Sequence, residues 1–228
     1  MNRRIKTIKN ILSSVITFLI VITSFLVAIG FSFNFVYIKT NVHGFSMYPT
    51  LNKNVDTIET AGDTIFINRF RALERNNVVV AKVSWFDNYI VKRLVGLPDD
   101  EIQIKEVDGN YLLFVNDELI YSKEKSNESS RGNTNENGTI GYYNKYIAFL
   151  NNEKYSKNVV INSKGEKCIK LNENEYFLMG DNWGESLDCL SKGPVNKSNI
   201  VGVVDLVVDY KDNLSNKVFE YIFKNLFS

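Results

Sequence analysis

A serine near the start of the polar part of the chain is the first residue that could perform covalent chemistry. Ser46 lies in the stretch HGFSMYPTL, residues 43–51. A serine hydroxyl is a weak nucleophile until a neighbouring base removes its proton. His43 is the only histidine, and in an extended segment the side chains of residues three apart point to opposite faces. We therefore expect His43 to be a surface or interface residue rather than the base.

Lysine is the alternative base, but only where its surroundings are apolar. A free ammonium has a pKa near about 10.4, and burial can lower that pKa by several units. Most lysines here lie in polar stretches, whereas Lys82 in VVVAKVSW and Lys92 in YIVKRLVGLPDD have apolar neighbours. Either side chain could instead point to solvent from an alternating strand. The periodicity alone leaves both lysines open as bases.

A third segment supplies short polar side chains after an apolar run. Residues 176–179 read YFLM and are followed by GDNWGESLD, residues 180–188. Gly-Asp-Asn after a strand is a turn signal, so a tight loop is the simplest interpretation. The loop also brings Ser186 and Asp188, whose side chains are able to orient a lysine amine.

An N-terminal anchor must come before any of these segments. Residues 1–10 carry four basic residues and no acid, and residues 11–38 contain no charged residue. A helix needs about 20 apolar residues to cross the hydrocarbon core, and basic flanks stay in the cytoplasm. A cleaved signal peptide would have a shorter apolar core. We predict a cytoplasmic segment over 1–10 and a retained transmembrane signal anchor over 11–38, with the remainder of a single-pass membrane protein outside the cytoplasm.

The rest of the chain reads as mainly β. Short runs of β-branched and aromatic residues are separated by Gly, Asn and Asp, which is typical of strands and turns. The predicted strands cover 64–68, 78–83, 89–95, 101–105, 111–115, 118–121, 175–179 and 201–208. The predicted parts are a core over 39–105 and 171–210, an inserted region over 106–170 and a tail over 211–228. The tail has near-helical apolar spacing, so it either covers the core or lies on the membrane surface.

Composition excludes some classes of function. The 27 basic and 26 acidic residues give a formal net charge of +1, which provides no general attraction for nucleic acid. His43, Cys168 and Cys189 have no metal-ligand spacing, so we expect no metal site. The two cysteines either form a disulfide outside the cytoplasm or remain thiols.

Taken together, three segments resemble the type I signal peptidase family. They are GFSMYPTL, YIVKRLVGLPDD and MGDNWGESLD, which follow the anchor in this order. The resemblance implies a β catalytic core with an inserted β cap after the lysine segment, and a membrane-bound endopeptidase that cuts signal peptides from preproteins. It implies that Ser46 is the nucleophile and Lys92 the general base, with no metal or organic cofactor.

The same resemblance assigns supporting roles. Ser186 would hydrogen-bond the lysine amine, Asp181 and Asp188 would be structural, and the Ser46 N–H would be one oxyanion donor. Gly44 stands where some members have a serine, so the second donor is unassigned. By closeness in sequence to Ser46 and Lys92, we expect the substrate pocket to be formed by Val42, Met47, Leu51, Ile90 and Val91.

The third motif departs from the family pattern. Trp183 and Leu190 stand where the family commonly has arginines, so Asp188 needs a partner other than arginine. Asp99 replaces a glycine in the second motif. These departures suggest a narrow substrate set, such as pilin or surface-fibre subunits.

Two rival interpretations remain at this stage. One is a non-catalytic relative that assembles surface fibres or pili, which need not keep both a serine and a lysine base. The other is a soluble Ser–Lys self-cleaving regulator that binds DNA, which would lack the anchor.

Overall fold

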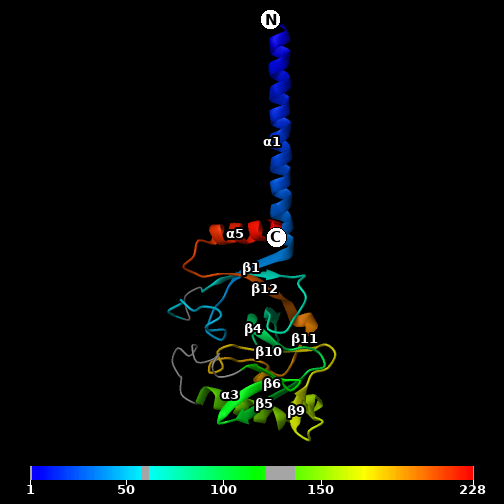
Figure 1. The fold of residues 1–228 in the computed structure, drawn as a ribbon, viewed down its shortest axis with the longest axis vertical. Helices are drawn as coiled ribbons and strands as arrows, with labels where there is room; N and C mark the ends of the chain where they lie inside the picture. Colours follow the sequence, from blue (N-terminus) through cyan, green and yellow to red (C-terminus); the bar gives the residue numbers. More distant parts are fainter. Residues whose placement is uncertain (1, 58–61, 122–136, 228) are drawn as a thin grey trace. The chain divides into compact units, whose positions relative to one another are not determined.

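The computed structural model describes residues 2–57, 62–121 and 137–227. The chain divides into two compact units, Met1–Ile38 and Lys39–Ser228. The first unit is the helix α1, Asn2–Val36, drawn in blue in Figure 1. Within it, the 30 residues Thr7–Val36 are long and apolar enough to cross a membrane by length and composition. This stretch overlaps most of the predicted span over 11–38.

The second unit contains a seven-stranded sheet that positions the candidate chemistry. Its strand order is β1-β2-β12-β3-β4-β10-β11. The strands are β1 (Tyr37–Asn41), β2 (Thr64–Asn68), β3 (Val78–Lys82), β4 (Tyr89–Gly96), β10 (Glu175–Met179), β11 (Val195–Asn196) and β12 (Ile200–Val208). Antiparallel pairing of β4 with β10 joins two segments that lie far apart in the sequence (Figure 1). The second and third motifs therefore meet at one place in the sheet.

A five-stranded antiparallel sheet is built from the chain between β4 and β10. Its order is β7-β6-β5-β9-β8, with β5 (Glu101–Val107), β6 (Asn110–Val115), β7 (Glu118–Tyr121), β8 (Val159–Ile161) and β9 (Lys167–Lys170). Two tight hairpins join β5 to β6 and β6 to β7. The turn residues Asp108-Gly109 and Asn116-Asp117 all have positive φ, as two-residue hairpin turns require.

The boundary between the two sheets differs from the predicted one. The prediction placed residues up to 105 in the core, whereas β5 already belongs to the five-stranded sheet. The chain crosses between the sheets at 97–100, directly after Gly96. A Cβ on Gly96 would lie 2.7 Å from Ile102 Cδ1 and 2.8 Å from Leu171 Cδ1. The glycine thus permits the close packing at which one sheet passes into the other.

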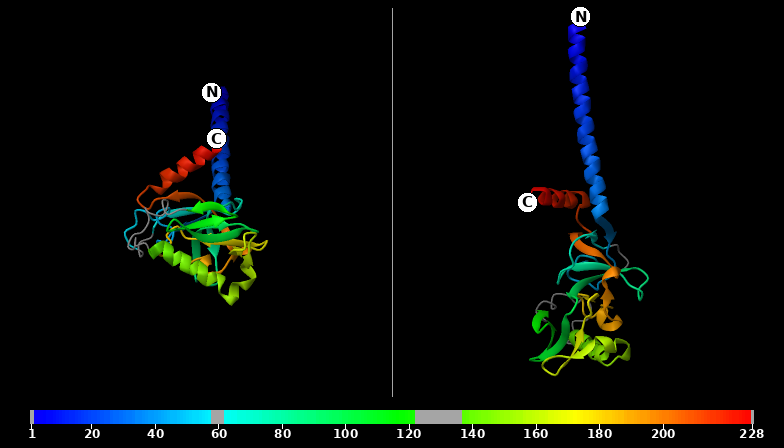
Figure 2. Two further views of the ribbon diagram at one scale, coloured as in Figure 1. Left: turned by 60° about the horizontal axis from the view of Figure 1, so that its bottom comes forward. Right: turned by 90° about the vertical axis from the view of Figure 1, so that its right-hand side faces the viewer.

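The inserted region also contains a long helix that the prediction missed. The helix α3 spans Asn137–Leu150 and contacts β5, β6 and β9. Figure 2 shows this yellow-green helix along the five-stranded sheet. Its buried residues Tyr142, Tyr146 and Phe149 follow the i, i+4, i+7 spacing of a helix face. The polar composition of residues 122–139 predicts an exposed loop. Residues 122–136 lie outside the described residues, whereas residues 137–139 belong to α3 and not to a loop.

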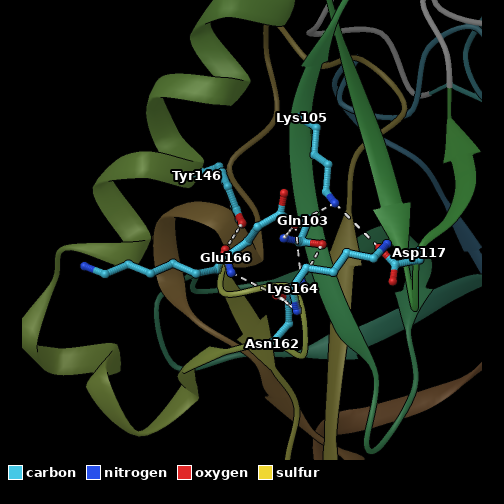
Figure 3. Close-up of polar contacts among 8 residues, drawn as sticks. Gln103, Lys105, Asp117, Tyr146, Asn162, Lys164 and Glu166 are labelled. Atoms are coloured by element: carbon cyan, nitrogen blue, oxygen red, sulfur yellow. Dashed lines mark hydrogen bonds and ion pairs between the residues drawn. The ribbon is translucent and has the colours of Figure 1, made fainter.

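A polar network ties the hairpins of the five-stranded sheet together (Figure 3). Glu166 accepts hydrogen bonds from Lys105 at 2.8 Å and from Gln103 at 3.1 Å. These hydrogen bonds lower the pKa of Glu166 to about 2, and the bond from Lys105 has the largest effect. Asp117 pairs with Lys164 at 2.8 Å and with Lys105 at 3.5 Å. Lys105 therefore links the β6–β7 turn to the turn before β9.

The apolar core runs through both sheets and joins them. Buried side chains from the seven-stranded sheet, such as Leu94 and Phe177, belong to one cluster with Ile102, Ile169 and Phe149. Removing this much apolar surface from water is the main favourable term for folding. It also explains why the two sheets form one compact unit.

The remaining helices lie near the C-terminus or are short. They are η1 (Glu153–Asn158), α4 (Cys189–Lys192), η2 (Lys197–Asn199) and α5 (Leu214–Phe227). The helix α5 falls in the predicted tail and contacts β12. Cys168 and Cys189 are both buried and free, so they are thiols in this structure.

Candidate active site

Ser46 lies in a compact turn that is fastened to the third motif. Within the turn, Tyr48 N–H donates to Phe45 O at 3.0 Å. The backbone N–H of Asn182 donates to Ser46 O at 3.0 Å, and the Asn182 side-chain amide donates to Phe45 O at 3.0 Å. Gly44 has a φ of +80°, a conformation that side chains rarely adopt. Backbone contacts therefore fix the position of the Ser46 side chain.

Lys92 reaches Ser46 from the middle of β4. It pairs with Val79 of β3 and is only 4% exposed. Its Nζ lies 2.5 Å from Ser46 Oγ and 3.1 Å from the carbonyl oxygen of Val91. The other lysine with apolar neighbours, Lys82, is exposed and donates to Asp87 O at 2.8 Å. The structure thus brings Lys92, and not Lys82, to the serine.

The surroundings of Lys92 favour its neutral form. Burial lowers the pKa of its ammonium to about 8, although the nearby carboxylates of Asp188 and Asp181 act in the opposite direction. A neutral amine carries a lone pair that can accept a proton from a hydroxyl. The pair can therefore act as a nucleophile and its base without a histidine.

Asp188 and Ser186 form a buried polar group next to the dyad. Ser186 Oγ donates to Asp188 Oδ2 at 2.6 Å, and Gly180 N–H donates to the same oxygen at 3.2 Å. Tyr142 OH donates to Asp188 Oδ2 as well. The hydrogen bonds of Lys92 go to Ser46 and Val91, so the role of Ser186 toward the amine stays a prediction.

Asp181 links all three motifs. Its carboxylate accepts hydrogen bonds from Arg93 Nε at 2.7 Å and from Arg93 Nη2 at 2.5 Å. Thr50 Oγ1, from the end of the serine turn, donates to Asp181 Oδ2 at 2.5 Å. The sequence reasoning did not single out Arg93 or Thr50. Strand alternation was the available signal, because it turns Arg93 to the face opposite Lys92.

The residues expected to form the substrate pocket separate into two groups. Val42, Met47, Leu51 and Ile90 are all buried, with exposures of 6% or less. Ile90 shares a face of β4 with Lys92, because side chains two apart lie on the same side. Val91 is half-buried and points to the opposite face. The structure does not bring the Val91 side chain to the Lys92 face.

An unpaired strand edge lies beside the dyad. The register of β10 with β4 ends at Met179 opposite Arg93. Residues 89–92 continue past this point, and in the described ranges they pair only with β3. Antiparallel alternation directs the backbone groups of Tyr89 and Val91 away from β3. This edge can accept an extended peptide by backbone hydrogen bonds.

Comparison with known proteins decides the family. The family model described as signal peptidase, peptidase S26, matches residues 12–209. The chain belongs to this signal peptidase family.

No cluster of three or more His, Cys, Asp or Glu residues that could hold a metal ion is found in the part of the chain that the structure describes.

Individual relatives agree with the family. Signal peptidase I P of Bacillus subtilis subsp. natto is 30% identical over 174 residues, which cover 73% of this chain and 74% of the relative. Signal peptidase I of Streptococcus pneumoniae R6 is 26% identical over 177 residues, covering 74% and 80%. A solved signal peptidase I of Enterococcus faecalis V583 has a TM-score of 0.35 and 18% identity, covering 58% of this chain and 97% of that chain.

The family model and the curated relatives confirm the predicted family and activity, and the two sheets confirm the mainly β fold class. The chain is a membrane-anchored serine peptidase that removes signal peptides from preproteins. The non-catalytic assembly factor and the DNA-binding regulator are not favoured by these relatives.

Proposed function

We propose that Ser46 and Lys92 are the catalytic dyad of this signal peptidase. The observation that carries the proposal is the 2.5 Å separation of Ser46 Oγ and a buried Lys92 Nζ. Neutral Lys92 takes the proton of Ser46 as Ser46 Oγ attacks the scissile carbonyl carbon. The resulting lysine ammonium then gives that proton to the leaving amine.

The second half of the reaction uses the same groups. Lys92, neutral again, takes a proton from water as the water attacks the acyl-enzyme ester, and it gives that proton to Ser46 Oγ as the ester bond breaks and the cleaved signal peptide leaves with a free carboxylate. The tetrahedral oxyanion in each half is held by donors that include the backbone N–H of Ser46. Asp181 supports the site by holding Arg93 and Thr50, and Asp188 by holding Ser186.

We further propose that the signal peptide binds extended along the free edge of β4. This edge supports the proposal, because the backbone groups of Tyr89 and Val91 that face away from β3 pair with no other strand in the described ranges and can continue the sheet into the substrate. Small residues at the first and third positions before the cut would fit shallow apolar walls. These walls are supplied by the buried residues Val42, Met47, Leu51 and Ile90.

The proposed topology places residues 1–10 in the cytoplasm and the catalytic unit on the opposite side of the cell membrane, where the scissile bond emerges. The basic flank of the anchor supports this orientation. Added protease should digest the catalytic unit in intact cells stripped of their wall. Digestion only after lysis would contradict the orientation.

We propose a narrow substrate set, such as pilin or surface-fibre subunits, on the basis of the departures at Asp99, Trp183 and Leu190. Deleting the gene and sequencing the N-termini of exported proteins tests this proposal. We expect uncut precursors for a few surface proteins only. Accumulation of most preproteins would contradict it.

The dyad is tested with the full chain in detergent and a fluorogenic signal-peptide substrate. Ser46→Ala and Lys92→Ala should each lower kcat by more than about 10³-fold. Lys82→Ala is the matched control, since it removes an exposed lysine from the adjacent strand, and it should keep wild-type kcat. Cleavage that survives either dyad substitution would overturn the mechanism.

A further inference from the structure

The helix α3 of the inserted region contacts the third motif at several points. Tyr142 OH donates to Asp188 Oδ2, and the Tyr142 ring stacks on Trp183 with centroids 4.6 Å apart and planes 6° apart. One turn along the same helix, Lys145 Nζ donates to Ser186 O at 3.0 Å. A helix outside the seven-stranded sheet is thus attached to the loop behind the dyad.

The Asp188 carboxylate depends on hydrogen bonds from neutral groups. Its side chain is fully buried, and among the described residues no cation lies within salt-bridge distance of it, although its charge acts on Lys92. Its donors are Ser186 Oγ, the backbone N–H groups of Gly180 and Leu190, and Tyr142 OH. A buried carboxylate is tolerated only when such donors surround it. The Tyr142 phenol is the only one of these donors that comes from outside residues 180–190.

The phenol remains a donor at working pH. Burial of Tyr142, together with the neighbouring charge of Asp188, raises the pKa of its hydroxyl well above the ordinary value. The ammonium of Lys145 lies 4.8 Å from the centroid of the Tyr142 ring. The hydroxyl therefore keeps its proton, and its hydrogen bond to Asp188 sets its direction.

A short path leads from Asp188 to the nucleophile. Asp188 holds both the Ser186 hydroxyl and the Gly180 N–H. A Cβ on Gly180 would lie 2.3 Å from Ser186 Oγ and 2.5 Å from Ser46 O, so the backbone at Gly180 is packed directly between the two serines. A shift of Asp188 therefore displaces the surface against which Ser46 rests.

We propose that Tyr142 is a positioning residue of the catalytic site. Its hydroxyl orients Asp188, and Asp188 in turn fixes Ser186 and Gly180 behind the Ser46–Lys92 pair. In this chain a tyrosine of the inserted region fills the place left by the missing arginines of the third motif. The inference rests on the proposed dyad. It means that the inserted region helps to position the residues of the active site.

The test compares two tyrosines of the same helix in the full chain with a fluorogenic signal-peptide substrate. Tyr142→Phe removes the hydroxyl and keeps the stacking ring. Tyr146→Phe removes the hydroxyl of a second buried tyrosine of the same helix. That hydroxyl donates to Lys167 O at 3.0 Å, on the side of the five-stranded sheet (Figure 3). We expect kcat to fall about tenfold in Tyr142→Phe with KM within twofold of wild type, and kcat to stay unchanged in Tyr146→Phe.

A double-mutant cycle shows whether Tyr142 acts through Asp188. Adding Tyr142→Phe to Asp188→Asn should lower kcat by less than about twofold beyond the single Asp188 variant, because the phenol then has no carboxylate to orient. Two independent, multiplying losses would overturn the inference. So would a kcat for Tyr142→Phe equal to that of Tyr146→Phe.

A second variant decides if Tyr142→Phe does not fold. Asp188→Asn removes the carboxylate that Tyr142 orients and keeps a side chain of the same size; a loss of kcat of about tenfold or more at constant KM supports the inference, and an unchanged kcat overturns it. Failure of the dyad is distinguishable. The dyad fails if Ser46→Ala still cleaves, whereas this inference fails when Ser46→Ala is inactive and the variants at Tyr142 and Asp188 cleave like wild type.

Discussion

Replacing Lys92 by methionine should make the protein inactive and more stable at neutral pH. Lys92 is buried, and its pKa falls from 10.5 to about 8 on folding. The native state thus binds this proton less tightly than the unfolded chain does. From about pH 8 to about 10.5 the unfolded chain keeps a proton that the native chain has lost, so stability rises with pH across this window. Below about pH 8 the destabilising effect of the charge is fully present.

The expected magnitude follows from the size of the pKa shift. At about 1.36 kcal/mol per unit, the shift corresponds to a destabilisation of about 3 kcal/mol at pH 7 and less than about 1 kcal/mol at pH 10. Methionine fills a similar volume without a charge. It also removes the hydrogen bond to Ser46 Oγ, which is worth about 1 kcal/mol. The net gain for Lys92→Met is therefore about 2 kcal/mol at pH 7 and close to zero at pH 10.

Thermal unfolding of the full chain in detergent measures this difference. A gain of about 2 kcal/mol corresponds to a rise in Tm of roughly 4–8 °C for a unit of this size. Lys82→Met is the control, because Lys82 is exposed on the adjacent strand and its replacement should change stability by less than about 0.5 kcal/mol. A Tm that falls at pH 7, or a gain that is the same at pH 7 and pH 10, would refute the idea that Lys92 is a buried amine with a lowered pKa.

The remaining predictions concern the same site. Because the base must be neutral, kcat/KM should rise about tenfold per pH unit below about pH 8 and level off above it; a profile that is flat from pH 6 to 9 would exclude Lys92 as the base. Gly180→Ala should destabilise the protein by more than about 2 kcal/mol and abolish cleavage, since its Cβ would lie 2.5 Å from Ser46 O. Gly184→Ala is the control, because its Cβ would meet only an atom 3.8 Å away, and it should keep wild-type stability and cleavage. Asp181→Asn should lower stability by about 2–3 kcal/mol, because Arg93 would lose its charged partner; unfolding curves that match wild type would show the pair to be dispensable.

Much of the fold could be predicted because its strands carry local signals. The central strands are short runs of β-branched and aromatic residues between turn residues, as in β2 and β10, which were predicted with their observed bounds. The hairpins at Asp108-Gly109 and Asn116-Asp117 combine such runs with residues that tolerate positive φ. By contrast, β8 and β11 are only three and two residues long, and their pairing depends on partners distant in the sequence. The helix α3 was hidden because it is rich in aromatic residues, which have low helix propensity, and packing rather than propensity holds it in place.

The geometry of the site was harder to predict than its residue types. Apolar neighbours marked both Lys82 and Lys92. The family resemblance favoured Lys92, and the tertiary structure places Lys92 at Ser46 and leaves Lys82 exposed. Sequence proximity grouped Ile90 with Val91, although strand alternation places their side chains on opposite faces. The Arg93–Asp181 pair joins residues 88 apart in the sequence, and no local pattern indicates such a contact.

Asp188 shows how physical reasoning narrows a site that sequence patterns leave incomplete. The motif lacks its usual arginines, so a buried carboxylate there requires uncharged hydrogen-bond donors to take their place. That requirement follows from the sequence alone, but the donor's identity does not, because any hydroxyl or amide brought near by folding would suffice. The structure supplies Tyr142, which is 46 residues away and lies on a helix that the strand pattern did not reveal. A hydroxyl of the inserted region therefore completes the set of local donors to a carboxylate of the third motif, and this contact constrains the two parts of the chain together.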